Sequence, residues 1–149
     1  TSELVPLASK MSIATDPTFM ERKGDGWKEF AETYGLDFKE VSGMSYDLMY
    51  QALKNKEVDA AVAYSTDGRI VAFDLVTLED DKNFFPPYDC ALFIKEDLLE
   101  KYPEIEEIVA PLIGAIDEET MSKLNSQVDS EKKEPKDVAN EYLKEQGLI

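Results

Sequence analysis

The segment that most constrains the fold of this chain runs from residue 57 to residue 88. Near its start, residues 58–63 are rich in small and β-branched side chains, and a cluster of turn residues follows them. A short run of this kind is typical of a strand that is buried on both faces, as in a parallel sheet. Tyr64 stands where the strand should end, before a polar turn at residues 65–67. The pattern predicts a parallel sheet with an aromatic side chain at its carboxyl edge.

The residues before this segment alternate between strand and helix patterns. We expect strands at residues 11–15 and 36–41, and a buried helical stripe that begins at Trp27 and ends at Gly35. A second helix is expected at residues 46–56, in which Tyr46 and Tyr50 are interpreted as packing residues. Asp16 and Pro17 predict the start of a short helix. Short links between these elements make two βαβ units and therefore a mostly parallel sheet.

The remaining residues change in character along the chain. We expect a short helix at residues 67–73, a strand at 75–78 and a buried strand at 88–95, which would enclose Cys90 as an inert thiol. Helical faces follow: one from residue 105 that is interrupted at Pro111, one capped by Asp117 and one that begins at Pro135. The pattern predicts an α/β ligand-binding lobe at residues 1–95 and a helical segment at residues 96–149.

Composition excludes several functions. The net charge of −16 argues against a nucleic-acid partner and against an anionic membrane surface. The chain has no histidine and one cysteine, so we expect no histidine-based catalysis, no zinc site and no cofactor. An enzyme would have to use carboxylates such as Asp16, Asp67 and Asp89, and we interpret the chain as a binding protein instead. The first residues contain neither the basic nor the apolar part of a signal peptide.

Several segments of the chain are similar to a known family. They are residues 49–59, 64–70, 78–82, 84–88 and 124–129. These segments resemble the substrate-binding proteins of glycine betaine/carnitine/choline ABC transporters, which import osmoprotectants. The resemblance runs nearly from end to end of this chain but covers only the C-terminal part of a family member. It implies a type II periplasmic-binding-protein-like fold, in which residues 1–95 form the second lobe and residues 96–149 pack on the missing first lobe.

The resemblance also implies a ligand site. Family members enclose a quaternary ammonium group in a cage of tyrosines between two lobes, and two of these tyrosines fall on Tyr64 and Tyr88. An arginine that holds the ligand carboxylate falls closest to Arg22, although the residues after it depart from the family pattern and leave Lys23 as an alternative. Thr66 is a further candidate contact. Glycine betaine, carnitine, choline and thione-bearing amino acids all remain open as ligands.

The same resemblance implies partners and a location. ABC permease subunits would receive the ligand, and the protein would be extracytoplasmic, tethered to the membrane as a lipoprotein or fused to the permease. A homodimer that covers the apolar helix faces is a further expectation. The alternative function is a ligand-sensing domain of the same fold that is not coupled to transport.

Overall fold

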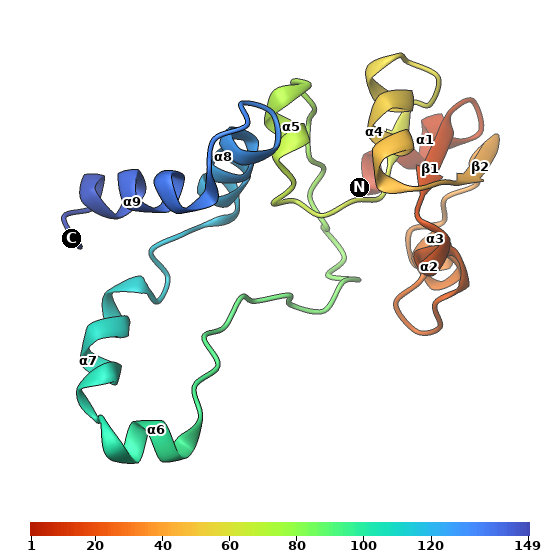
Figure 1. The fold of residues 1–149 in the computed structure, drawn as a ribbon. Helices are drawn as coiled ribbons and strands as arrows, with labels where there is room; N and C mark the ends of the chain where they lie inside the picture. The colour runs from red at the N-terminus through yellow and green to blue at the C-terminus, as the bar shows by residue number, and fades with distance from the viewer. The chain divides into compact units, whose positions relative to one another are not determined.

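The computed structural model describes all 149 residues, and the contacts within it divide the chain into two compact units (Figure 1). Unit 1 contains Thr1–Tyr64 and Val76–Pro87, and unit 2 contains Ser65–Leu75 and Tyr88–Ile149. The division expected after residue 95 concerns the lobes of a longer protein, and it stays a prediction. In this chain, residues 65–75 pack with the C-terminal helices and not with the sheet that precedes them.

Unit 1 is built on a three-stranded parallel sheet, which confirms the predicted α/β fold. The strands are β1 (Ser12–Thr15), β2 (Glu40–Gly43) and β3 (Ala60–Ala61), in the order β2-β1-β3. The prediction that residues 58–63 form a strand buried on both faces is wrong in part. The strand β3 contains only two residues. Both are half-buried, because β3 lies at the edge of the sheet and pairs with one strand only. The second strand likewise begins at Glu40 and not at Leu36.

Two helix boundaries of unit 1 lie where the sequence predicts them, at Asp16 and Gly35, whereas the helix expected at residues 46–56 ends at Lys54. The Asp16 carboxylate accepts hydrogen bonds from the backbone N–H groups of Thr18 and Phe19, and Pro17 occupies the first helical position. Gly35 ends the next helix in the left-handed conformation, with φ of 72°. These elements are η1 (Ser2–Leu4), α1 (Val5–Ala8), α2 (Pro17–Glu21), α3 (Trp27–Tyr34) and α4 (Tyr46–Lys54), and Figure 1 shows α2 and α3 side by side.

An aromatic core holds unit 1 together. Its buried members are Ala8, Ile13, Phe19, Phe30, Tyr34, Leu36 and Phe38. Trp27 packs against this core but is only half-buried, so it is a border residue of the core and not a central one. The late segment Val76–Pro87 returns to the same core, and the ring of Phe30 lies 5.4 Å from that of Phe84 and 5.6 Å from that of Phe85, measured between centroids.

The returning segment is held by hydrogen bonds and not by strand pairing. The Asp80 carboxylate accepts hydrogen bonds from the Tyr34 hydroxyl and from the N–H groups of Phe84 and Phe85, the last two at 3.0 and 2.9 Å. Burial acts to raise the pKa of Asp80, but these hydrogen bonds outweigh it and lower the pKa. The strand predicted at residues 75–78 is therefore wrong: this stretch has no regular structure, and Val76 is 85% exposed.

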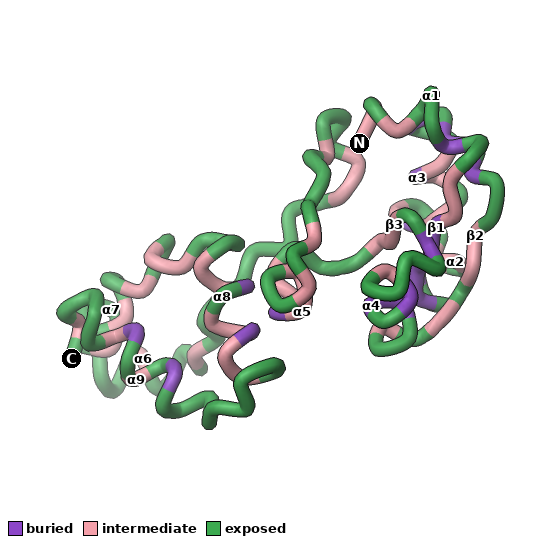
Figure 2. Tube along the Cα trace, turned by 90° about the horizontal axis from the view of Figure 1, so that it is seen from above, coloured by how far each residue is buried: buried purple, intermediate pink, exposed green.

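Unit 2 is helical, as predicted for the C-terminal residues. Its helices are α5 (Gly68–Ala72), α6 (Glu96–Lys101), α7 (Glu104–Val109), η2 (Ala110–Leu112), α8 (Glu118–Asp129) and α9 (Pro135–Glu145). The expected interruption at Pro111 appears as the change from α7 to η2, and the Asp117 carboxylate caps α8 by accepting from Thr120 N–H at 2.8 Å. Figure 2 shows buried positions on α8 and α9, where Ser122, Ser126, Val138 and Tyr142 lie.

The buried strand predicted at residues 88–95 is not formed. This stretch is extended but pairs with no strand, and most of its side chains are exposed, including Phe93 at 96%. Cys90 is also exposed, so the prediction of a buried, inert thiol is wrong as well. Apolar composition indicated a strand here, but a strand also needs a partner, and this chain does not supply one. No helix has both the length and the apolar character needed to cross a membrane.

Candidate functional site

The carboxyl ends of the three parallel strands bring three polar or aromatic side chains of unit 1 together. Asp16 directly follows β1, Tyr46 opens the helix after β2, and Tyr64 comes shortly after β3. The Tyr46 hydroxyl donates a hydrogen bond to Asp16 Oδ2 at 3.1 Å. The rings of Tyr46 and Tyr64 lie 5.9 Å apart between centroids, with their planes inclined at 34°. Because ligands bind at this edge of open α/β sheets, the cluster is a candidate site.

The two tyrosines of this cluster differ in exposure. Tyr64 is 53% exposed, so its ring is available at the surface, whereas Tyr46 is half-buried beside it. Burial, the hydrogen bond to Asp16 and the charge of that carboxylate all raise the pKa of Tyr46 above that of an ordinary tyrosine. The sequence pattern indicates a packing role for Tyr46, whereas the structure places it at the candidate site. Its position shortly after the second strand is the signal in the sequence that could indicate this place.

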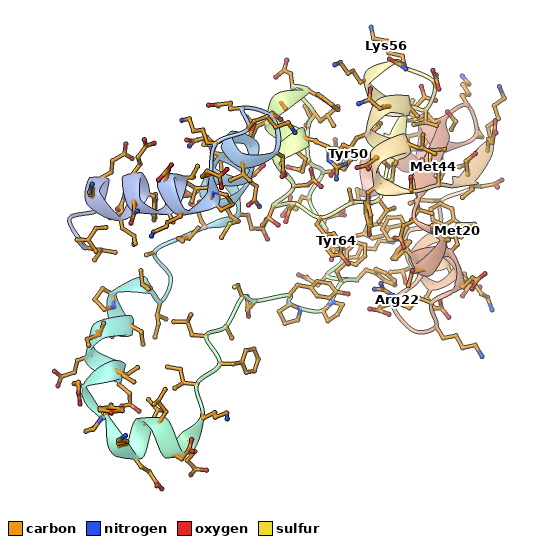
Figure 3. All side chains as sticks on the ribbon, viewed as in Figure 1. Met20, Arg22, Met44, Tyr50, Lys56 and Tyr64 are labelled. Carbon is orange, nitrogen blue, oxygen red and sulfur yellow. The ribbon has the colours of Figure 1, made fainter.

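Arg22 follows the last residue of α2, at the end of the helix opposite Asp16. Its Nη1 is 3.4 Å from Asp25 Oδ2, and its guanidinium carbon is 5.9 Å from the centroid of the Phe19 ring. Arg22 also lines a shallow cavity of about 350 Å³ with Pro17, Thr18 and Glu21. Figure 3 shows Lys56 at the top of unit 1, and Arg22 and Tyr64 both in its lower part. A ligand carboxylate that reached Arg22 would share it with Asp25.

The backbone near Arg22 makes a tight turn. A Cβ atom added to Gly26 would lie 2.0 Å from the carbonyl oxygen of Arg22, so only glycine fits at this point. Lys23, the alternative partner for a ligand carboxylate, is exposed in the same turn. The structure therefore gives Arg22 a defined environment and leaves Lys23 in solvent.

In unit 2, the turn that contains Thr66 is anchored by α8. The Thr66 carbonyl accepts a hydrogen bond from Asn125 Nδ2 at 2.8 Å, and the Asp67 carbonyl accepts one from Ser122 Oγ at 3.0 Å. The Asp67 carboxylate binds Arg69, with Oδ2 2.7 Å from Nη2, and caps α5. Residues 124–129, which the sequence singled out, therefore include a side chain that holds the Thr66 turn.

Gly68 makes this anchoring possible. It is buried at the start of α5, and an added Cβ atom would lie 2.4 Å from Ser126 N and 2.6 Å from the carbonyl carbon of Asn125. The two helices thus approach each other through backbone atoms. A side chain at residue 68 would separate Asn125 from the carbonyl that it binds.

Tyr88 lies in the extended stretch that opens the second part of unit 2, and it is 59% exposed. Tyr64 and Arg22 belong to unit 1, whereas Thr66 and Tyr88 belong to unit 2. The ligand roles of these four residues stay predictions. No group of three or more His, Cys, Asp or Glu side chains is placed to hold a metal ion.

Comparisons with known proteins identify the class. The family model OpuAC, the substrate binding domain of ABC-type glycine betaine transport system, matches residues 2–145. The carnitine transport binding protein OpuCC of Listeria monocytogenes is 42% identical over 148 residues, which are 99% of this chain and 48% of that protein. The glycine-betaine-binding protein of Pseudomonas aeruginosa is 38% identical over 139 residues, 92% of this chain and 44% of that protein.

Two solved structures are also similar to nearly the whole of this chain. The crystal structure of a glycine betaine/carnitine/choline ABC transporter protein matches with a TM-score of 0.93 and 40% identity, over 99% of this chain and 54% of that chain. Apo YehZ from Escherichia coli matches with a TM-score of 0.80 and 26% identity, over 99% of this chain and 56% of that chain. The chain spans about half the length of the relatives that it matches.

The family model and the solved structures thus both match nearly the whole chain, and the family is one of transport binding proteins. The chain belongs to the OpuAC family of substrate-binding domains of ABC-type glycine betaine transport systems. Both the family and the non-enzymatic class expected from the sequence are confirmed.

Proposed function

We propose that this chain forms one lobe of the solute-capture protein of an ABC importer for quaternary ammonium compounds. The observation that carries the proposal is Tyr64, which is 53% exposed at the carboxyl edge of the parallel sheet in a member of this family. A trimethylammonium group donates no hydrogen bonds and is attracted by the faces of aromatic rings. Tyr64 and Tyr88 supply such faces, and Thr66 contributes a polar contact.

One lobe does not make a complete site. Each ring contributes about 0.5–2 kcal/mol to the binding of a cation. Micromolar affinity requires about −8 kcal/mol, so the two tyrosines of this chain fall short without rings from the first lobe. The chain alone should therefore bind choline weakly or not at all.

The helical residues 96–149 are proposed to pack on the first lobe, which this chain does not contain. Several large apolar side chains in this segment are exposed, including Ile108 at 69% and Ile113 at 78%. Covering such exposed apolar side chains with another surface lowers the free energy, because it removes apolar area from water. In the chain by itself, a second copy could cover them instead, which would make a homodimer.

The ligand class depends on Arg22. Glycine betaine and carnitine each carry a carboxylate that a guanidinium can pair with, whereas choline does not. Relatives of this chain are named for carnitine, for glycine betaine and, in Helicobacter pylori, for ergothioneine. The Helicobacter pylori protein is named as both permease and binding protein, which supports an extracytoplasmic protein that is fused to its permease or anchored beside it.

Titration of the two-lobed protein with choline and glycine betaine tests the proposal. Tyr64→Phe keeps the ring and should cost little, whereas Tyr64→Ala and Tyr88→Ala should each weaken both ligands by about tenfold or more. Arg22→Ala should weaken glycine betaine and spare choline. Equal losses for Tyr64→Phe and Tyr64→Ala would argue for a hydrogen-bonding role and against a ring wall. If Arg22→Ala changes neither ligand, Lys23 is the next residue to test.

A further inference from the structure

Asp16 does more than cap a helix. It is 9% exposed, and its two carboxylate oxygens have separate tasks. Oδ1 accepts from the N–H groups of Thr18 and Phe19 at 2.9 and 3.1 Å, which starts α2. Oδ2 accepts from the hydroxyl of Tyr46 at 3.1 Å, which is 30 residues further along the chain. One buried carboxylate thus connects the end of β1 with the start of α4.

The ring of Tyr46, held by Asp16, in turn contacts the ring of Tyr64. Its ring lies 5.9 Å from the Tyr64 ring at an inclination of 34°, within the range in which aromatic pairs attract each other. Tyr64 is 53% exposed, and an exposed side chain without a neighbour would lose rotational freedom when a ligand binds. A neighbouring ring that restricts Tyr64 beforehand reduces that cost, because preorganised side chains lose less freedom on binding.

We propose that Tyr46 is a positioning residue, which holds the Tyr64 ring in place for a cationic ligand while Asp16 holds the Tyr46 hydroxyl. This inference rests on the proposed function, since it gives Tyr46 a role through Tyr64. Tyr46 itself need not touch the ligand. The ring pair accounts for the effect, and the hydrogen bond to Asp16 sets the orientation of the Tyr46 ring.

A double-mutant cycle on the two-lobed protein tests the inference, with choline as the probe. Tyr46→Leu should weaken choline by about two- to tenfold, the range that an aromatic pair contributes. Tyr46→Phe keeps the ring and should restore most of this loss. In the Tyr64→Ala background, Tyr46→Leu should have no further effect, because the ring that it positions is absent.

The hydrogen bond has its own test. Serine is a good helix cap but is too short to reach Tyr46, so Asp16→Ser should keep α2 and lose the bond to the hydroxyl. Asp16→Ser and Tyr46→Phe should weaken choline to a similar and small extent, and the double variant should be no weaker than either. Unfolding of this chain by itself, followed by the fluorescence of its single tryptophan, Trp27, checks that each variant is folded.

The outcomes separate this inference from the proposed function. If Tyr64→Ala leaves choline affinity unchanged, the proposed ring wall is wrong, and so is the role of Tyr46. If Tyr64→Ala weakens choline but Tyr46→Leu does not, the proposed function stands and the positioning role is wrong. An equal loss from Tyr46→Leu with and without the Tyr64 ring would also overturn it, because Tyr46 would then act independently of Tyr64.

Discussion

Replacing Gly68 with alanine is a sensitive test of how unit 2 is assembled, because two effects predict opposite signs. Alanine is favoured over glycine in a helix by up to about 1 kcal/mol, so propensity alone predicts that Gly68→Ala stabilises α5. The structure predicts the reverse. The new Cβ atom would lie 2.4 Å from Ser126 N and 2.7 Å from Ser126 Cα, and neither is the end of a flexible side chain.

The size of the effect follows from these distances. Ordinary contact begins near 3.4 Å, so α5 and α8 must separate by about 1 Å. Overpacking of this kind costs about 1–3 kcal/mol. The separation also strains the bonds from Asn125 to Thr66 and from Ser122 to Asp67, each worth about 0.5–1.5 kcal/mol. After the gain in propensity, we expect Gly68→Ala to lower the free energy of unfolding of unit 2 by about 1–4 kcal/mol.

Urea unfolding followed by two signals measures this change. Far-ultraviolet circular dichroism reports the helices, which dominate unit 2, and the fluorescence of Trp27 reports unit 1. The dichroism transition should move to lower urea and the fluorescence transition should move less. Gly43→Ala is the matched control, since its Cβ atom would meet only Met20 Cγ at an ordinary 3.8 Å. A Gly68→Ala variant as stable as the parent would show that α5 does not lie against the α8 backbone.

Three further predictions concern unit 1. Burial and the hydrogen bond to Asp80 raise the pKa of Tyr34 to about 12. The contribution of Tyr34 to the free energy of unfolding should therefore be fully present below a pH of about 10 and be lost as the pH rises to about 12. The stability of Tyr34→Phe, measured by alkaline unfolding, should not fall over this range. Because hydrogen bonds lower the pKa of Asp80 despite its burial, stability should fall as pH drops below about 4, and acid unfolding of Asp80→Asn should show a smaller fall. Phe30→Ala should cost about 3–5 kcal/mol in urea unfolding, since Phe30 is 6% exposed and contacts several rings; a loss below about 1 kcal/mol would contradict this core.

The parts of the fold that could be predicted depend on local signals. Asp16 and Gly35 bound their helices because a cap needs only a few neighbouring residues, and the sequence shows those directly. The start of α8 could be predicted for the same reason, because Asp117 is its N-cap. The strands predicted at residues 75–78 and 88–95 are not formed, because the composition of a segment does not show whether a partner strand exists. The first is instead held by the contacts of Asp80, and the second is exposed.

Only part of the candidate site could likewise be predicted from the sequence. Tyr64 could be placed at a strand end from the sequence, because the end of a strand is visible in the turn residues that follow it. The position of Tyr46 shortly after the second strand could indicate that it lies near this edge, but its contacts with Asp16 and Tyr64 could not be predicted, since no periodicity links these three residues. The tie between Asn125 and the Thr66 carbonyl spans 59 residues and is likewise visible only in three dimensions.

The exposed Cys90 gives this chain a built-in attachment point. It is the single thiol in the sequence, so a maleimide dye should attach at one position without mutagenesis, two residues along the chain from Tyr88. A dye that is sensitive to polarity would then report when the neighbourhood of Tyr88 becomes covered, whether by a ligand or by the first lobe. The same thiol can join two copies through an intermolecular disulfide under oxidising conditions. Any measurement of a homodimer therefore needs a reductant, so that association through apolar helix faces is separated from covalent pairing.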